Sequence, residues 1–351
     1  MIIGESLHPY YLWPLLAFVI SVVVTLLMIR IPIYDVPNER SSHQKMTPRG
    51  AGLGILLAFT GVWMTRGLSG IPFYDLYIGW MLCLGASVVM GLVGFMDDLF
   101  NIKESTKLMI QLLIVFSLTV FGIRFFTFPL PILGDISLNM PVSIVITTLW
   151  IVGFMNAYNF MDGLNGMTGI VTIIASFFWF LITHQLSCDV LSYSALILIF
   201  ALLGFLGFNF PKAKIFLGDV GSLFMGSLFA FWAILGTLPQ FGRISLWTVP
   251  MLFCLYLYDV IFTRIRRLYR GYPFMSSHRE HLYQLLNRTG WSHAQVVSLY
   301  GGFFCLQGIT AYFMQEVSSQ YHLYFFFPFI GIYGILTYKI LIKSRQHNIH
   351  V

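Results

Sequence analysis

The sequence contains few charged residues. Asp, Glu, Lys and Arg make up only 10% of its 351 positions, whereas hydrophobic residues make up 58%. A soluble globular domain carries about 25% charged residues, so this composition excludes a single soluble core. The longest polar stretch, 264–295, covers about thirty residues, and no internal repeat or low-complexity segment is visible. The chain therefore leaves no room for a sizeable soluble domain.

Cysteine is also scarce. The four cysteines are Cys83, Cys188, Cys254 and Cys305, and three of them lie inside long apolar runs. They form no C-x-x-C pair and have no metal-ligand spacing, which argues against a disulfide framework or a cysteine-based metal site. We expect them to be thiols packed among apolar side chains.

Long hydrophobic runs, in contrast, fill the sequence. A run of roughly 17 to 25 apolar residues can cross the ~30 Å hydrocarbon core of a bilayer as a helix. Eleven runs of this kind lie at about 10–30, 51–65, 76–95, 108–123, 141–157, 167–183, 191–208, 217–238, 247–263, 296–314 and 321–342. We predict an all-α polytopic membrane protein with about eleven transmembrane helices, folded as a single integral membrane domain over residues 1–351.

The basic residues predict the orientation of these helices. No Lys or Arg precedes the first run, unlike in a signal peptide, whereas four basic residues follow it between positions 30 and 49. The positive-inside rule then places the N-terminus outside and the C-terminus in the cytoplasm. The predicted cytoplasmic loops are about 31–50, 96–107, 156–166, 209–216 and 264–295. With Arg30 and the C-terminal tail they hold 17 of the 20 basic residues, so the net charge of +6 reflects topology, and we expect no nucleic-acid partner.

Acidic residues collect on the same predicted side. Nine of the fourteen lie in the cytoplasmic loops or at their membrane boundary. Eight of these nine belong to five polar clusters, and the ninth, Asp259, lies in the apolar run 247–263. The clusters are DVPNERSSHQKMTPRGAG (35–52), GFMDDLFNIKESTK (94–107), NAYNFMDGLNG (156–166), PKAKIFLGDVGS (211–222) and SSHREHLYQLLNRTGW (276–291). Ionisable groups at membrane depth cost at least ~2.5 kcal/mol on insertion scales and indicate a functional site by default. Because a helix bundle brings its helix ends together, the five clusters can form one site.

Two of the clusters contain carboxylates suited to a divalent cation. The neighbours Asp97 and Asp98 would repel each other unless a cation or basic group offset their charges, and paired oxygen ligands suit Mg²⁺. Asp219 lies between glycines at the start of an apolar run, where glycine lets a ligand approach the backbone closely. An interfacial acidic pair and an aspartate N-cap are the simpler interpretations.

The other clusters offer amides and cations. Asn156 and Asn159 are three residues apart on one helical face that Asp162 continues, and their oxygens also suit Mg²⁺, although a polar helix end with a glycine C-cap would look the same. The HREH segment, His278 to His281, lacks a third zinc ligand and suits phosphate contacts better. A solvated basic loop lying against anionic lipid is its alternative interpretation. Together the clusters indicate phosphate-ester chemistry between a soluble diphosphate and a membrane-embedded partner.

The same five motifs, in this order and on this topology, resemble the polyprenyl-phosphate N-acetylhexosamine-1-phosphate transferase family. The match covers about residues 35–291. The resemblance implies transfer of a sugar-1-phosphate from a UDP-N-acetylhexosamine to undecaprenyl phosphate, with release of UMP and with Mg²⁺ (Mn²⁺ as an alternative) as cofactor. It also implies a bacterial cytoplasmic (inner) membrane protein whose active site faces the cytoplasm. The resemblance leaves open whether the protein forms a homodimer.

The resemblance assigns roles by position. Asn159 and Asp219 would hold the metal. Asp97, Asp98 and His278 would be catalytic, the aspartates either reacting or positioning the lipid phosphate. The substrate-binding residues would be Asn156, Asp162, Arg279, His281, Lys107 and Arg49.

One departure concerns Asn101, where family members often carry Asp or Lys three residues after the aspartate pair. We therefore assign the nearby basic role to Lys107. HREH in place of a run of histidines, together with TPRGAG, favours the branch that starts O-antigen or related cell-envelope glycans over the phospho-N-acetylmuramoyl-pentapeptide transferases. A secondary transporter is the rival from another class, although transporters usually place ionisable groups near the membrane midplane. A two-step route through an aspartyl-phosphate also stays open.

Overall fold

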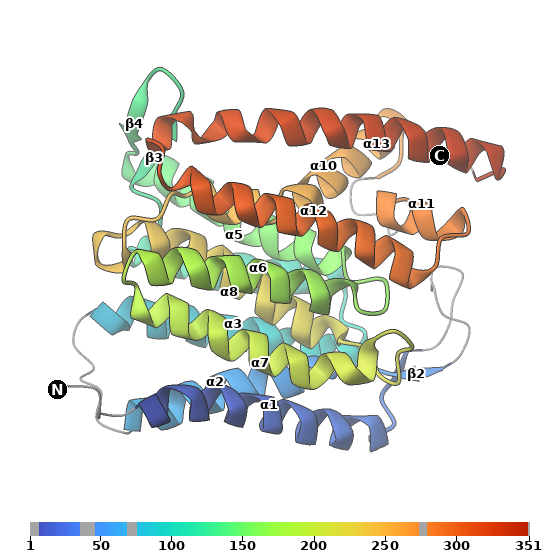
Figure 1. The fold of residues 1–351 in the computed structure, drawn as a ribbon, viewed down its shortest axis with the longest axis horizontal. Coiled ribbons are helices and arrows are strands. Elements are labelled where there is room, and N and C mark those ends of the chain that lie inside the picture. The colour runs from blue at the N-terminus through green and yellow to red at the C-terminus, as the bar shows by residue number, and fades with distance from the viewer. Residues whose placement is uncertain (1–6, 36–45, 69–75, 274–278, 350–351) are drawn as a thin grey trace.

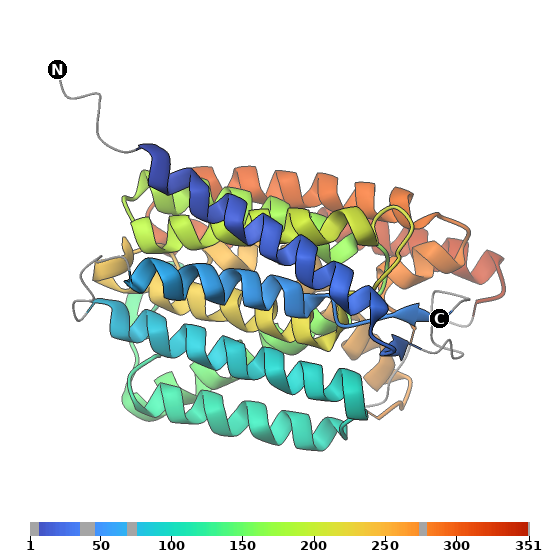
Figure 2. The same ribbon diagram turned by 90° about the horizontal axis from the view of Figure 1, so that it is seen from below.

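The computed structural model describes residues 7–35, 46–68, 76–273 and 279–349. It is a bundle whose long helices run roughly side by side (Figures 1 and 2). The α-helices are α1 (Leu7–Arg30), α2 (Gly52–Leu68), α3 (Leu76–Phe100), α4 (Glu104–Val120), α5 (Met140–Phe160), α6 (Met167–Gln185), α7 (Asp189–Asn209), α8 (Gly218–Thr237), α9 (Thr248–Leu252), α10 (Cys254–Tyr269), α11 (Leu282–Arg288), α12 (His293–Met314) and α13 (Phe326–Gln346). Short 3-10 helices span Pro239–Phe241 and Ser319–Phe325.

Eight segments of the described chain are long and apolar enough to cross a membrane: Leu12–Arg30, Ile78–Phe100, Met140–Phe160, Met167–Gln185, Asp189–Asn209, Gly218–Thr237, His293–Met314 and Ser319–Gln346. The chain is thus a multi-pass membrane protein. The remaining three predicted runs are also helical, but none of them forms a single helix long and apolar enough to be counted among these eight. α2 and α4 have 17 residues each, and the run at 247–263 is divided at Phe253 between α9 and α10. The count of about eleven and the orientation stay predictions.

Helix α8 forms the centre of the bundle. Its side chains are buried along almost the whole helix, from Val220 to Gly236, and it packs against α3 and α5. Aromatic residues fill much of this core. The rings of Trp179 and Trp232 stack with centroids 5.9 Å apart, and Phe229 lies edge-on to Phe253 at 4.8 Å. Such a close-packed core holds α8 in a fixed place.

Glycines let α2, α3 and α8 approach closely at one end of the bundle. A Cβ atom on Gly94 would lie 2.3 Å from the carbonyl oxygen of Asp219, and one on Gly52 would lie 2.3 Å from the backbone of Gly221. Real Cβ atoms never come so near, so only glycine permits these contacts. The end of α3 and the start of α8 are therefore held backbone to backbone.

Two short hairpins lie at opposite ends of the bundle (Figure 1). β1 (Tyr34–Asp35) pairs antiparallel with β2 (Thr47–Pro48), and β3 (Thr127–Leu130) pairs with β4 (Gly134–Ser137). Just past β2, the backbone N–H groups of Ala51 and Gly52 donate to the carbonyls of residues 216 and 217. The first hairpin is thus fastened to the start of α8.

The helices continue into the segments predicted as cytoplasmic loops. α3 ends at Phe100, α5 at Phe160 and α10 at Tyr269, and α11 lies inside 264–295. Asp97 and Asp98 are therefore on the last turn of α3, and Asn156 and Asn159 are near the end of α5. All described parts of the five clusters lie at the same end of the bundle, which confirms their predicted convergence.

Candidate active site

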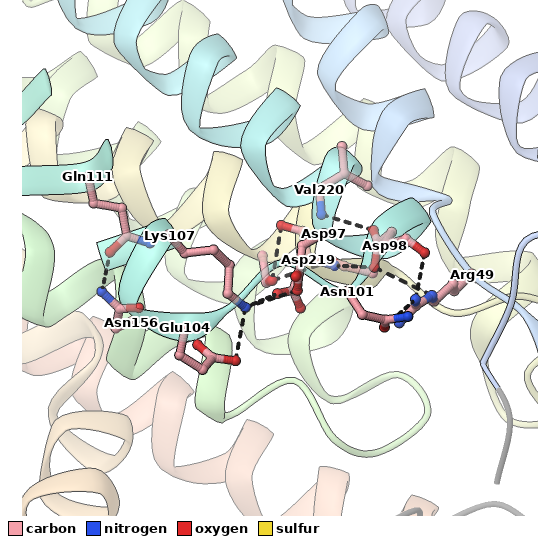
Figure 3. A network of polar contacts seen from close by, with 12 residues as sticks. Arg49, Asp97, Asp98, Asn101, Glu104, Lys107, Gln111, Asn156, Asp219 and Val220 are labelled. Atoms are coloured by element: carbon pink, nitrogen blue, oxygen red, sulfur yellow. Dashed lines mark hydrogen bonds and ion pairs between the residues drawn. The ribbon is translucent and has the colours of Figure 1, made fainter. Parts of the chain in front are cut away.

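The carboxylate of Asp98 binds the first turn of α8. Its Oδ1 accepts from the N–H of Asp219 at 3.1 Å, and its Oδ2 accepts from the N–H of Val220 at 3.2 Å (Figure 3). The first N–H groups of a helix have no partner inside it, and an anion there is favoured by the helix dipole. Gly218, at φ +80°, leaves the space that Asp98 fills. Asp98 thus caps α8 from α3 and positions Asp219.

Arg49 closes the other side of Asp98. Its guanidinium donates to the carbonyl of Asp98 at 2.5 Å and to Oδ1 of Asn101 at 3.3 Å, and its Nε lies 3.8 Å from the Asp98 carboxylate. Asn101 has φ +50°, a left-handed conformation that asparagine tolerates better than most residues. The unusual asparagine in the sequence thus ends α3 and holds Arg49.

Asp97 lies among different partners although it is the next residue along the chain. Lys107 of α4 reaches Oδ2 of Asp97 at 2.9 Å, Oδ2 of Asp219 at 3.3 Å and Oε1 of Glu104 at 3.1 Å (Figure 3). One ammonium group therefore offsets the repulsion between carboxylates from α3 and α8. The predicted substrate-binding Lys107 acts here as the cation that lets Asp97 and Asp219 lie side by side.

A small polar cavity of about 310 Å³ opens beside these carboxylates. Most of its wall is charged or carries amide groups, and four predicted site residues besides Asp98 and Asp219 contribute to it. These four are Arg49, Asn159, Asp162 and Arg279. Burial raises the pKa of the Asp162 carboxyl to about 7, and the negative charge of Asp219 adds to the rise. The cavity is large enough for a small-molecule ligand.

A second cavity of about 1110 Å³ reaches the carboxylates of Asp97 and Asp219. Apolar side chains of α5 and α10 line most of it, including Phe154, Leu257 and Ile261. Its polar end is lined by Asp97, Lys107, Asn156, Arg264 and His281. Adjacent aspartates of α3 therefore face different cavities, Asp98 the small one and Asp97 the large one.

The two cavities share part of their walls. Asn159, Phe160, Asp219 and Gln284 line both. Asn156, one turn before Asn159, instead donates to Oε1 of Gln111 at 2.7 Å and so ties α5 to α4. The predicted metal ligands Asn159 and Asp219 thus lie where the two cavities meet.

The oxygen atoms at this junction fit a magnesium ion that also binds substrate oxygens. Within the described part of the chain, no three His, Cys, Asp or Glu side chains lie close enough to hold a metal by themselves. Mg²⁺, however, is usually bound by one or two carboxylates together with substrate phosphates and water. Asp219 and Asn159 supply a carboxylate and an amide oxygen of that kind, with the Asp97 carboxylate beside them.

The histidine motif is only partly described. His278 falls outside the described residues. Arg279 lines the polar cavity, and the buried His281 lies on the wall of the large cavity, where its Nδ1 is 3.1 Å from Oδ1 of Asp259. Two predicted substrate-binding residues of this motif thus lie at different cavities.

Sequence reasoning assigned no role to several residues of the site. Phe216 and Tyr283 line the polar cavity, Gln111 bonds to Asn156, and Asp259 is fully buried beneath the histidine segment. Asp259 carried a signal that could have revealed it, because it is a lone carboxylate within the apolar run 247–263. The aromatic residues carried none, since phenylalanine and tyrosine are abundant along the whole chain.

These features define a multi-pass membrane protein with a carboxylate-lined site at one end of its bundle, between a polar and a largely apolar cavity. Comparison with known proteins agrees. A family model described as glycosyl transferase family 4 matches residues 80–237, from within α3 to the end of α8. The matched segment includes Asp97, Asp98 and Asp219.

Relatives match most of the chain. A probable undecaprenyl-phosphate N-acetylglucosaminyl 1-phosphate transferase of Bacillus subtilis is 30% identical over 300 residues, 84% of this chain and 82% of the relative. A decaprenyl-phosphate N-acetylglucosaminephosphotransferase of Mycobacterium tuberculosis is 30% identical over 304 residues, 78% of this chain and 74% of the relative. A phospho-N-acetylmuramoyl-pentapeptide-transferase of Staphylococcus epidermidis is 30% identical over 277 residues, 74% of this chain and 83% of the relative. The chain belongs to glycosyl transferase family 4, the polyprenyl-phosphate N-acetylhexosamine-1-phosphate transferases.

Proposed function

We propose that this protein transfers an N-acetylhexosamine-1-phosphate from a UDP-N-acetylhexosamine to undecaprenyl phosphate and releases UMP. The observation that carries the proposal is the pair of cavities of opposite character that meet at Asn159 and Asp219. A reaction between a water-soluble diphosphate and a lipid phosphate requires such a pair, because each substrate needs its own surroundings until the reacting groups touch.

The polar cavity suits the nucleotide sugar. The cations Arg49 and Arg279 in its wall can pair with phosphate oxygens, and amides such as Asn165 and Asn209 can bond to a base or a sugar. The half-buried ring of Phe216 offers a flat face on which a base can stack. Asp162, which the resemblance assigns to the nucleotide-sugar pocket, lies in the same wall.

The large cavity suits the lipid acceptor. Its apolar walls on α5 and α10 match an isoprenoid chain, and Lys107, Arg264 and His281 gather at the end that carries Asp97. A lipid phosphate at that end would lie next to both cations and carboxylates. With the phosphate in that position, the isoprenoid chain would lie against the apolar side chains of the cavity.

The proposed reaction joins the two phosphates at the shared wall. An oxygen of the lipid phosphate attacks the β-phosphorus of the donor, and the bond from that phosphorus to the bridging oxygen breaks, so that UMP leaves with the oxygen. Asn159 and Asp219 would hold Mg²⁺ (or Mn²⁺), which would neutralise charge on the diphosphate and on the leaving UMP. Lys107 and Arg264 reduce the repulsion between the two anions, and the cavities align them.

The two adjacent aspartates would then act differently. Asp97 faces the cavity assigned to the acceptor and is the candidate to orient the lipid phosphate or take its proton. A phosphate monoester is already mostly ionised at pH 7, since its second pKa is about 6, so orientation is the larger part of this role. Asp98 would act through α8, whose first turn it caps. An attack by Asp97 itself, forming an aspartyl-phosphate, is the two-step alternative.

The proposal extends to location and product. The predicted topology places the site at the cytoplasmic face of a bacterial inner membrane, with the N-terminus outside. The product would start O-antigen or a related cell-envelope glycan. The phospho-N-acetylmuramoyl-pentapeptide-transferase relative keeps a peptide-bearing donor as the alternative. The transporter interpretation loses support because the carboxylates lie at one end of the bundle and the chain belongs to a transferase family.

The test is UMP release by the purified protein. We expect release only with undecaprenyl phosphate, only with Mg²⁺ or Mn²⁺, and from one member of a donor panel. The panel contains UDP-GlcNAc, UDP-GalNAc, a UDP-6-deoxy-HexNAc and UDP-N-acetylmuramoyl-pentapeptide. Release from the last alone would replace the proposed donor. The proposal would be contradicted if well-folded protein released no UMP from any donor in the panel, or if chelation of divalent metal did not affect the release.

A further inference from the structure

The carboxylate of Asp259 is buried at a junction of three helices. It lies on α10, and its side chain is completely inaccessible to solvent. Within the described chain it binds donors from its own helix, from the start of α11 and from α12. The donors are Oγ1 of Thr263 at 3.1 Å, Nδ1 of His281 at 3.1 Å, the N–H of Leu282 at 2.9 Å, the N–H of Tyr283 at 3.3 Å and the hydroxyl of Tyr300 at 2.9 Å.

This arrangement repeats the one at Asp98. In both places a buried carboxylate of one helix accepts from two consecutive backbone N–H groups at the start of another helix. Asp98 thereby holds Asp219, and Asp259 holds His281. A buried carboxylate is costly unless hydrogen bonds satisfy its lone pairs, and the five donors around Asp259 do so only while α10, α11 and α12 keep these positions.

His281, which Asp259 binds, packs against Phe160 in the wall that the two cavities share. The His281 ring stacks between Phe160, with centroids 6.3 Å apart, and Tyr283, with centroids 6.0 Å apart. The Tyr283 hydroxyl donates to the carbonyl of Phe160 at 3.1 Å, and a Cβ atom on Gly163 would lie 2.2 Å from that hydroxyl. The start of α11 is therefore docked on the end of α5, next to Asn159.

An ionised carboxylate only accepts hydrogen bonds, so Nδ1 of His281 must carry the proton that it shares with Asp259. In the neutral ring the other nitrogen, Nε2, then has the lone pair. The partner of one ring nitrogen sets which tautomer a histidine adopts and how its ring is turned. Asp259 thus determines the chemical form in which His281 lines the large cavity.

We propose that Asp259 is a positioning residue for the transfer reaction: it fixes the place and the tautomer of His281 at the wall of the large cavity. The inference rests on the proposed function and deepens it. Asp259 touches neither cavity wall in the described structure, so its effect on the reaction passes through His281.

The variant Asp259→Asn tests this proposal. Its amide group keeps the size of the carboxylate but places a donor against other donors, so His281 loses its fixed form. We expect kcat to fall by roughly 10- to 100-fold, as when the partner that orients a functional histidine is changed, with a smaller change in the KM of the UDP-sugar. Tyr300→Phe is the matched control: it removes one bond to the same carboxylate without touching His281, and we expect activity within about threefold of wild type.

A double-mutant cycle separates positioning from simple loss of structure. If Asp259 acts through His281, the variant Asp259→Asn/His281→Ala will be no slower than His281→Ala alone, because the second change removes the group that the first one orients. Multiplying losses would overturn the proposal. So would a loss in Tyr300→Phe equal to that in Asp259→Asn.

A spectroscopic readout does not depend on turnover. In ¹⁵N-histidine-labelled protein, the signal absent from His281→Gln identifies His281, and we expect it to show a protonated Nδ1 in the wild type and a changed signal in Asp259→Asn. If the wild-type protein released UMP from no donor, the proposed function would fail, yet this measurement would still decide the positioning of His281. An unchanged His281 signal in Asp259→Asn would overturn the proposal.

Discussion

The two cavities differ in almost everything except the wall they share. The smaller, about 310 Å³, is lined by charged and amide groups, and the larger, about 1110 Å³, is lined mostly by apolar side chains of α5 and α10. Asn159 and Asp219 belong to both. Under the proposed function, this difference means that each substrate is recognised on its own surface, while the reacting groups meet at the wall between the two cavities.

This division predicts that changes at the shared wall have the largest effect. Asp219→Asn and Asn159→Ala should each lower kcat by at least about 100-fold, because each removes an oxygen ligand or charge at the place where phosphate charge develops. The rate of UMP release measures kcat, and size-exclusion chromatography in detergent checks that each variant is folded. Asp189→Asn, the same change at the start of α7 at the opposite end of the bundle, should leave activity unchanged. Normal turnover in a well-folded Asp219→Asn or Asn159→Ala would remove that residue from the metal site.

A second prediction concerns how the wall is held in place. Gly94→Ala would put a Cβ atom 2.3 Å from the carbonyl oxygen of Asp219, so α3 and α8 must separate. We expect a loss of stability of about 1–3 kcal/mol, typical of overpacking, together with a large loss of activity. Gly153→Ala is the control, since a Cβ atom there meets nothing within 4 Å. Thermal unfolding and UMP release should both distinguish the two alanines, and equal behaviour would contradict the close contact.

A third prediction separates the polar cavity from the apolar one. Phe216→Ala removes an aromatic face from the polar cavity only, and base stacking on an aromatic ring contributes about 1–3 kcal/mol. The KM of the UDP-sugar should rise by roughly 5- to 160-fold, and the KM of undecaprenyl phosphate should change little. Steady-state kinetics with each substrate varied in turn will show this. An equal rise in both constants would mean that Phe216 supports the fold and not the donor.

The smallest effect is expected in the large cavity. Gly153 of α5 lines it and faces open space, so Gly153→Leu should project into the path of the lipid chain without disturbing its neighbours. A long flexible chain can shift around one side chain, so the acceptor KM should rise only about fivefold, equivalent to roughly 1 kcal/mol. The donor KM should stay constant. If the donor constant rose and the acceptor constant did not, the assignment of the cavities would be reversed.

The sequence predicts where the site lies because ionisable groups are rare in apolar segments. Asp97, Asp162 and Asp219 stand out at the ends of hydrophobic runs, and a bundle brings those ends together. The family resemblance is confirmed by the matched relatives. The roles of the individual residues stay predictions.

What the sequence does not predict is how neighbouring residues divide their tasks. Asp97 and Asp98 are adjacent, so they point about 100° apart around α3, and only the placement of α4 and α8 decides which cavity each one faces. Lys107 likewise contacts three carboxylates: Asp97 of α3, Asp219 of α8 and Glu104 in the first turn of its own helix, α4. Asp259 gains its role from α11 and α12, which come later in the chain.

The measurement that tests the two-cavity account most directly is photolabelling of the acceptor site. A polyprenyl phosphate with a diazirine on its first isoprene unit should label α5 and α10 around Gly153 and Leu257, and saturating UDP-sugar should leave this labelling intact. Label on residues 162–165, 209 or 216–218, which line only the polar cavity, or displacement of the lipid by the nucleotide sugar, would show that both substrates use one cavity and would contradict the account.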